Sequence, residues 1–283
     1  MKTGAVADEQ RVTVTVEDGV ADVRLNRPDK MNALDTAMFR AIVEAGESLK
    51  GDPSVRAVVL SGEGRGFCAG LDFGSFQAMA GDEPREPRDQ GGGDVGAIAD
   101  TGGRITHLGQ QAAYVWTEVP VPVIAAVHGV ALGGGLQIAL GADIRVVAPD
   151  AKLSVLEIRW GLVPDMTATV MLPRLVGLDV AKELTFTGRM VAGEEAVRIG
   201  LATRVADDPR ATALEMAREI ASKSPHAVRA AKRLLEGTIT STVPEQLANE
   251  RTEIGALIGS PNQVEAVMAY FEKRDPKFAD PDG

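Results

Sequence analysis

The chain has 283 residues, of which 45% are hydrophobic and 25% charged, and its net charge is −10. This length and composition allow one substantial hydrophobic core, and the acidic balance argues against a nucleic-acid-binding surface, which needs clustered Lys and Arg. Residues 1–10 lack the apolar stretch of a secretion signal, and no apolar run reaches the roughly 20 residues of a membrane span, so we expect no membrane attachment.

The first part of the chain predicts strands and one helix. Apolar and polar residues alternate over 12–25 around the turn pair Asp18-Gly19, which predicts a β-hairpin. Asp35 is a suitable N-cap for a helix that ends near Gly51, and the apolar run from Val55 to Leu60 then predicts a further strand.

A glycine-bounded turn, Gly66–Asp72, follows this strand and contains Cys68, the single cysteine of the chain. One cysteine cannot form an internal disulfide, which fits a reducing compartment, and we expect a cytoplasmic protein. No histidine stands beside Cys68 in a recognisable motif, so we interpret Cys68 as a small buried packing residue rather than a nucleophile.

From Gly74 to about Arg104 the periodicity dissolves into Gly, Asp, Pro and Arg, and we interpret this segment as a mobile active-site lid. Gly91, Gly93 and Gly96 fit the G-x-G-x-x-G pattern. No strand precedes them, so the pattern does not predict a dinucleotide site.

The most informative stretch is the apolar run from Val121 to Val127 and the glycine-rich turn Ala131–Gln137 that follows it. Its three consecutive glycines put bare backbone at the start of a buried helix, where unpaired N–H groups attract negative charge. This turn and the turn Gly66–Asp72 are each able to offer one N–H to the same oxygen. Losing one donor of such a pair typically costs about 3 kcal/mol of transition-state stabilisation. The same glycines would also suit a tight turn alone.

The flanking segments complete an α/β pattern. We expect a helix over 106–117 and strands over 142–148 and 152–156, the latter ending at Glu157. Repeated strand, turn and helix units of this kind predict an α/β core.

Beyond about Gly200 the strand signals end and helical stretches follow, at 211–223, 225–235, 244–257 and 263–274. Ser224 is a predicted cap, and Ser260 with Gln263 predicts a capping box with Pro261 at the first helical position. We therefore divide the chain into an α/β core at 1–200 and a helical region at 201–283.

Several motifs occur in a fixed order: Asn26-Arg27-Pro28 with Asn32-Ala33-Leu34, then Phe67–Asp72, then Ala131–Gly135, then Gly161–Pro164. With these motifs the chain resembles the crotonase (enoyl-CoA hydratase/isomerase) superfamily from about Val12 to Phe278. The resemblance implies a spiral of ββα units and a C-terminal helical region that forms homotrimers, often paired into hexamers.

The resemblance also implies a site for acyl-CoA thioesters, in which the N–H groups of Leu71 and Gly134 hold the oxygen of an enolate. It implies no metal and no redox cofactor, because coenzyme A is part of the substrate. The positions that match CoA-binding residues of the family are Arg27, Lys30, Ala69 and Asp72, together with Tyr270 and Lys273, which commonly come from a neighbouring subunit.

Acid-base groups decide which reaction follows. Hydratases of the family use two glutamates; here the first position holds Gln137 and the second, twenty residues later, holds Glu157. An amide cannot take up a proton at neutral pH. Asp165 lies where dienoyl-CoA isomerases of the family carry an aspartate, although those enzymes also have an acid at the Gln137 position.

Our working hypothesis is double-bond isomerisation, with Glu157 and Asp165 moving a proton along the enolate. The alternatives are slow or selective hydration by Glu157, with Gln137 orienting the water, and a non-catalytic acyl-CoA-binding protein. Outside the resemblance, Glu157 also fits a solvated strand end and Asp165 a helix N-cap. The G-x-S-x-G motif of serine hydrolases does not occur in the sequence, so a serine hydrolase is not indicated.

Overall fold

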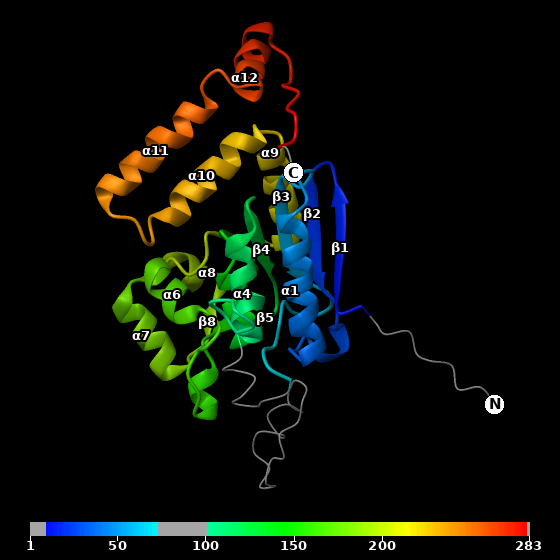
Figure 1. Ribbon diagram of the computed structural model, residues 1–283. Helices are drawn as coiled ribbons and strands as arrows, with labels where there is room; N and C mark the ends of the chain where they lie inside the picture. Colours follow the sequence, from blue (N-terminus) through cyan, green and yellow to red (C-terminus); the bar gives the residue numbers. More distant parts are fainter. Residues whose placement is uncertain (1–9, 73–100, 282–283) are drawn as a thin grey trace, which may run out of the picture.

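The computed structural model describes residues 10–72 and 101–281. Its larger sheet has six strands in the order β1-β2-β3-β4-β6-β9 (Figure 1). The strands are β1 (Val12–Glu17), β2 (Val20–Leu25), β3 (Ala57–Gly62), β4 (Val123–Val127), β6 (Ile144–Val147) and β9 (Arg204–Val205).

The first two strands pair as predicted. β1 and β2 form the predicted antiparallel hairpin, with Val12 opposite Leu25, and every later neighbour in this sheet is parallel. Strands β3 and β4 are buried along their whole length, apart from Gly62 at the end of β3, as is usual for parallel strands covered on both faces. The expectation that strands end before Gly200 is wrong in one respect, because the two-residue strand β9 pairs with β6.

A second sheet of three strands, in the order β5-β7-β8, leads into the triple-glycine turn. Its strands are β5 (Val130–Leu132), β7 (Lys152–Ser154) and β8 (Val191–Ala192). The strand expected over 152–156 ends at Ser154, and Glu157 begins a short 3-10 helix, η2 (Glu157–Trp160).

Helices cover both faces of the larger sheet because successive strand residues point to opposite sides. Val58 and Leu60 face one core together with Trp116 and Ile138, under α1 (Thr36–Lys50), α4 (Leu108–Glu118) and α5 (Gly134–Leu140). Val59 faces a second core under α9 (Pro209–Ala221). The core thus continues past Gly200, and the division at residues 200 and 201 stays a prediction.

The remaining helices lie at the two ends of the molecule (Figure 1). Near the second sheet are α6 (Ala168–Val176), α7 (Leu178–Thr187) and α8 (Gly193–Arg198). At the other end, α10 (Pro225–Gly237), α11 (Val243–Leu257) and α12 (Pro261–Glu272) extend from the sheet. None of the helices within the described ranges is both long and apolar enough to cross a bilayer.

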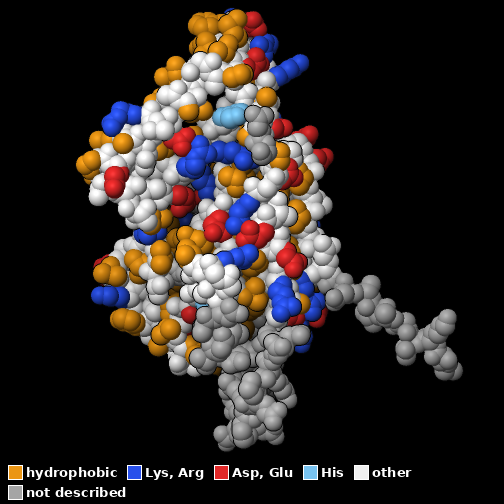
Figure 2. Space-filling model, viewed as in Figure 1, with side chains coloured by type: hydrophobic (Ala, Val, Ile, Leu, Met, Phe, Trp, Pro, Cys, Tyr) orange, Lys and Arg blue, Asp and Glu red, His pale blue; other side chains and the backbone are white. Residues whose placement is uncertain are grey.

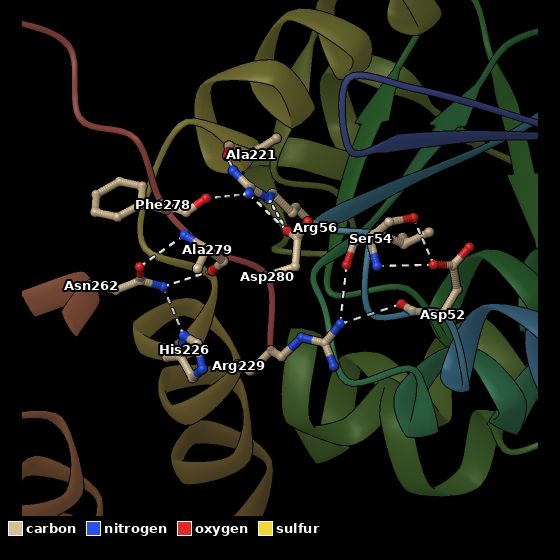
Figure 3. A network of polar contacts seen from close by, with 11 residues as sticks. Asp52, Ser54, Arg56, Ala221, His226, Arg229, Asn262, Phe278, Ala279 and Asp280 are labelled. Atoms are coloured by element: carbon tan, nitrogen blue, oxygen red, sulfur yellow. Dashed lines mark hydrogen bonds and ion pairs between the residues drawn. The ribbon is translucent and has the colours of Figure 1, made fainter. Parts of the chain in front are cut away.

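Two polar clusters tie these terminal helices to the core. The buried ammonium of Lys232 on α10 donates to the Trp116 carbonyl, the Val121 carbonyl and Asp143 Oδ2, at 3.3, 3.1 and 2.7 Å. In the second cluster, the buried Asn262 of α12 bonds both backbone groups of Ala279 and donates to His226 Nδ1 on α10 at 2.8 Å (Figure 3).

Arg56 joins this second cluster to the sheet. Its guanidinium pairs with Asp280 at 2.7 Å and donates to the carbonyl oxygens of Phe278 and Ala221 (Figure 3). The C-terminal tail is therefore bound by Arg56 of the core and by α12 at once.

All three predicted N-caps are formed, although the capping box at α12 is incomplete. Asp35 accepts the N–H of Met38 at 2.7 Å, and Ser224 caps α10. At α12, Ser260 accepts the N–H of Gln263, but the Gln263 side chain accepts from Gly259 instead of Ser260, so the capping box is only half formed.

Candidate active site

The turn Gly66–Asp72 lies between two other segments and is hydrogen-bonded to both. On one side the Cys68 N–H donates to the Val130 carbonyl at 2.9 Å, and the Cys68 carbonyl accepts from Leu132 at 3.0 Å. On the other side the Gly70 carbonyl accepts from Leu34 at 2.8 Å, and the Asp72 N–H donates to the Leu34 carbonyl at 3.1 Å. The two glycine turns that the sequence separates by sixty residues are therefore adjacent.

Gly70 sets the direction of the Leu71 N–H. In an extended chain the backbone groups of successive residues point to alternate sides, and Gly70, with φ +88°, breaks this alternation. Because Gly70 and Asp72 both bond Leu34, the N–H of Leu71 between them points away from Leu34, towards the side of the second turn. A Cβ at Gly70 would lie 2.6 Å from the Leu132 carbonyl oxygen and 3.8 Å from the Gly134 nitrogen, so the two turns touch.

The second turn presents the N-terminus of α5. Gly133 has φ 52° and ψ −122°, a conformation that only glycine adopts readily, and the helix begins at Gly134. A first-turn N–H has no partner within its own helix. Among the residues that the structure describes, neither the Leu71 N–H nor the Gly134 N–H has a hydrogen-bond acceptor.

Two buried side chains hold the first turn in place. The Asn32 amide donates to the carbonyl oxygens of Gly66 and Phe67, at 2.9 and 3.1 Å, and its oxygen accepts the N–H of Arg27. The Cys68 thiol is fully buried and donates to the Asn32 carbonyl at 3.1 Å. Burial raises the pKa of Cys68 to about 12, so the thiolate is not accessible at neutral pH and the thiol packs, as the sequence indicates.

Gln137 and Glu157 are in direct contact. The Gln137 Nε2 donates to Glu157 Oε1 at 2.7 Å, and the Gln137 Oε1 accepts the N–H groups of Met166 and Ala168 at 2.8 and 3.2 Å. Because two backbone donors face the amide oxygen, the amide nitrogen must face the carboxylate. Both side chains are buried.

The two N–H groups that hold Gln137 converge because Thr167 lies between them in the left-handed region, with φ +82°. A β-branched residue is strained in this conformation, and such strain is concentrated at functional sites. The Thr167 Oγ1 is buried without a partner among the described residues. Thr167 is absent from the sequence analysis, because its residue type gives no signal for a positive φ.

Glu157 is a buried carboxyl group beside the triple-glycine turn. Burial raises its pKa above the ordinary 4.5, backbone N–H groups and the Gln137 amide oppose this, and the charge of Asp165 adds to it. Its Oε2 has no partner within the described part of the chain. A Cβ at Gly133 would lie 3.3 Å from Glu157 Oε1, so the carboxyl group lies against the triple-glycine turn.

Asp165 lies close enough to interact with Glu157 electrostatically, although its side chain is exposed. Partial burial of the carboxyl group raises the pKa of Asp165, and the nearby His107 opposes this. His107 is buried, and its Nδ1 accepts the N–H of Gly109 as the N-cap of α4. The sequence gives no signal that places His107 at the site, because its position beside Asp165 depends on packing between distant segments.

The CoA-binding candidates fall into two groups. Arg27, Ala69 and Asp72 lie in adjoining turns: Arg27 pairs with Asp72 at 2.7 Å, and Ala69 donates to Met31 near the exposed Lys30. Two more candidates, Tyr270 and Lys273, are exposed on α12 and just after it, at the end of the molecule away from β5 (Figure 1). The structure of one chain does not bring the two groups together.

Most of the predicted lid, Gly74 to about Arg104, lies outside the described residues. No cluster of three or more His, Cys, Asp or Glu in the described ranges is arranged to hold a metal ion.

Comparison with known proteins identifies the family of the chain. Residues 15–281 match the family model for enoyl-CoA hydratase/isomerase. The chain therefore belongs to the enoyl-CoA hydratase/isomerase family, the crotonase superfamily, whose fold it shares.

Relatives within the family carry different activities. A mitochondrial methylglutaconyl-CoA hydratase of Mus musculus is 33% identical, covering 96% of this chain and 83% of its own. A mitochondrial Delta(3,5)-Delta(2,4)-dienoyl-CoA isomerase of Rattus norvegicus is 36% identical, over 91% and 78%. The crystal structure of an enoyl-CoA hydratase from Bacillus anthracis superposes with a TM-score of 0.83 at 30% identity, covering 95% of this chain and 99% of its own.

Proposed function

We propose that this enzyme isomerises the double bond of an enoyl-CoA thioester through an enolate. Leu71 and Gly134 donate their N–H groups to the thioester oxygen. Glu157 removes a proton from the carbon next to the carbonyl of a 3-enoyl thioester, and the electron pair spreads onto the oxygen. The same proton returns two carbons further along, so the double bond moves to the 2-position and no atom is gained or lost.

The observation that carries this proposal is the orientation of Gln137. Its amide nitrogen faces Glu157 at 2.7 Å while two backbone N–H groups hold its oxygen. Residue 137 thus supplies a hydrogen-bond donor that does not act as an acid or a base at neutral pH, and Glu157 is left as the carboxylate against the glycine turn. Isomerisation needs one group that takes and returns a proton, whereas hydration also has to activate a water.

Asp165 is proposed as a second proton carrier, which would extend the reach of Glu157 along the acyl chain. Its raised pKa and its interaction with Glu157 support this role. Hydration by Glu157 alone, with Gln137 orienting the water, is the second candidate, because the Gln137 amide is already fixed against the carboxylate.

The test is turnover of purified protein with saturated, 2-enoyl, 3-enoyl and dienoyl thioesters. We expect isomerisation of the 3-enoyl or dienoyl thioester to exceed hydration of the 2-enoyl thioester. Glu157→Gln should abolish turnover and keep acyl-CoA binding. A wild-type protein that binds these thioesters but turns over none of them would be a binding protein, and the proposal would then be wrong.

We also propose a homotrimer or hexamer in which Tyr270 and Lys273 bind the CoA of a neighbouring subunit. In the described chain α11 has no buried residue. Exposed apolar side chains follow one stripe on α11, at Val243, Leu247, Ile254 and Ile258, and another on α12, at Val264, Val267, Met268 and Phe271. Figure 2 shows hydrophobic side chains gathered over these helices.

Light scattering would measure the oligomeric state, and CoA affinity at several salt concentrations would test the lysine. We expect Lys273→Ala to weaken CoA binding and to reduce its salt dependence, because a phosphate contact is lost. The exposed Lys223 offers the matched control. Equal affinities for the two variants would remove the assignment of Lys273.

A further inference from the structure

A group of four charged side chains surrounds the chain segment that leads into and out of Leu71. Arg27 donates to Asp72 Oδ2 at 2.7 Å and lies 3.5 Å from Asp35 Oδ2. Arg11 pairs with the same Asp35 oxygen at 3.1 Å. The Arg27 and Asp72 side chains are only 15% and 20% exposed, so their pairing is shielded from water more than an ordinary surface ion pair is.

The ion pair closes over the short bridge between Leu34 and Leu71. On the segment that contains Leu34, Arg27 donates to the carbonyl of Ala33 at 3.1 Å. On the segment that contains Leu71, Arg27 binds the side chain of Asp72, whose own N–H donates to Leu34. One guanidinium thus binds both sides of the bridge from which the Leu71 N–H projects.

We propose that Arg27 and Asp72 are positioning residues that fix the direction of the Leu71 N–H. The inference rests on the proposed function, in which this N–H holds the thioester oxygen. Gly70 permits the turn of the backbone, and the ion pair keeps the following residue from rotating back. Neither side chain needs to touch the reacting atoms, because both act through the backbone of Leu71.

A role of the two side chains through their charge alone predicts different changes in kcat from a positioning role, so substitutions can distinguish the two. A carboxylate near a developing oxyanion is unfavourable, so removing the charge of Asp72 should raise kcat if only the charge mattered. Arg27→Lys keeps the positive charge but loses the planar fork that binds Asp72 and Ala33 together. A charge effect leaves Arg27→Lys active, whereas a positioning effect lowers its kcat.

The experiment compares Asp72→Asn, Arg27→Lys and the control Arg24→Lys. The control makes the same replacement in the nearby Arg24–Glu63 ion pair, which lies outside the bridge. Loss of an oxyanion donor lowers kcat by about 10²- to 10³-fold, and partial misalignment by less. We therefore expect a fall in kcat of roughly 10- to 100-fold for the two test variants, with KM changed by less than about threefold, and wild-type kinetics for the control. Asp72→Glu keeps a carboxylate for Arg27, so its kcat should be higher than that of Asp72→Asn.

A second measurement records the carbonyl stretch of a bound, isotope-labelled acyl-CoA by infrared spectroscopy, in a Glu157→Gln background. The wild-type turns should lower its frequency relative to solution, and Asp72→Asn and Arg27→Lys should return it towards the solution value. A raised KM with unchanged kcat and an unchanged stretch would make the pair a CoA contact and overturn the inference. If the wild type itself leaves the stretch at its solution value, the proposed function fails and this inference fails with it.

Discussion

Gln137→Glu would place a second carboxyl group in direct contact with Glu157. The N–H groups of Met166 and Ala168 would hold one oxygen of the introduced carboxylate, as they hold the amide oxygen now. The other oxygen would replace the amide nitrogen, which lies 2.7 Å from Glu157 Oε1. An attractive contact would become a contact between two acids.

The size of the effect follows from the distance. Two unit charges 4 Å apart repel by about 4 kcal/mol at an effective dielectric constant of about 20, which equals about three pKa units. The two oxygens here are closer than that, so the pair would hold one shared proton at neutral pH. Since burial already raises the pKa of Glu157, the added charge would raise the second ionisation of the pair, from one negative charge to two, further.

The assay follows hydration of a 2-enoyl thioester and isomerisation of a 3-enoyl thioester across the pH range in which the protein is folded. In the wild type Glu157 must be ionised to accept a proton. Its kcat/KM for isomerisation should therefore rise with pH through a midpoint above the ordinary 4.5. In Gln137→Glu we expect hydration to rise at least about tenfold, because the pair contains both an acid and a base, and the isomerisation midpoint to move to higher pH.

Gln137→Met is the matched control, since it keeps the volume of the side chain and removes its polar atoms. It should also move the midpoint upward, because the amide hydrogen bond lowers the pKa of Glu157, but it should not increase hydration. If hydration does not rise in Gln137→Glu and the midpoint does not move, residue 137 does not contact Glu157 in the working enzyme. The reasoning from the amide orientation would then be refuted.

Three further predictions concern the scaffold. Gly70→Ala should destabilise the protein by more than the roughly 1 kcal/mol that positive φ costs alanine, because its Cβ meets the Leu132 carbonyl; thermal melts should show a smaller loss for Gly103→Ala, where φ is +81° and the space is open. Asn262→Ala removes three hydrogen bonds and should lower the free energy of unfolding, measured in urea, by about 3 kcal/mol. The exposed Asn249→Ala should lower it by less than about 0.5 kcal/mol, and equal losses would show that the tail is not held by Asn262. Cys68 should resist alkylation in the folded protein and react on denaturation, so rapid labelling of native protein would contradict its burial.

The sequence predicts those features that depend on local pattern. The hairpin at β1 and β2, the Asp35 cap and the strand, glycine turn and helix around Gly134 all arise from residues close together in the chain. Local pattern also fails where an element is very short. Strand β9 has two residues, which is too few to show any alternation.

The candidate site depended on contacts that no local pattern contains. Gln137 and Glu157 stood out as side chains, but the direction of the Gln137 amide is set by Met166 and Ala168, which the sequence does not single out. The strained Thr167 and the place of His107 beside Asp165 are likewise products of tertiary packing. The resemblance supplied the positions of the two oxyanion donors, which spacing alone left open.

The arrangement separates the two tasks of the site between backbone and side chains. The donors proposed for the thioester oxygen are main-chain N–H groups whose direction is set by Gly70 and by the start of α5, so substitutions of acid-base side chains leave them in place. In the proposed function, by contrast, the fate of the enolate depends on whether residue 137 carries an amide or a carboxyl group. Because the paired N–H groups of Met166 and Ala168 can donate to a carboxylate oxygen as they now donate to the amide oxygen, exchanging Gln137 for Glu needs no change of backbone. If the proposed function holds, the acid-base chemistry of this chain can therefore be changed at residue 137 without rebuilding the oxyanion donors.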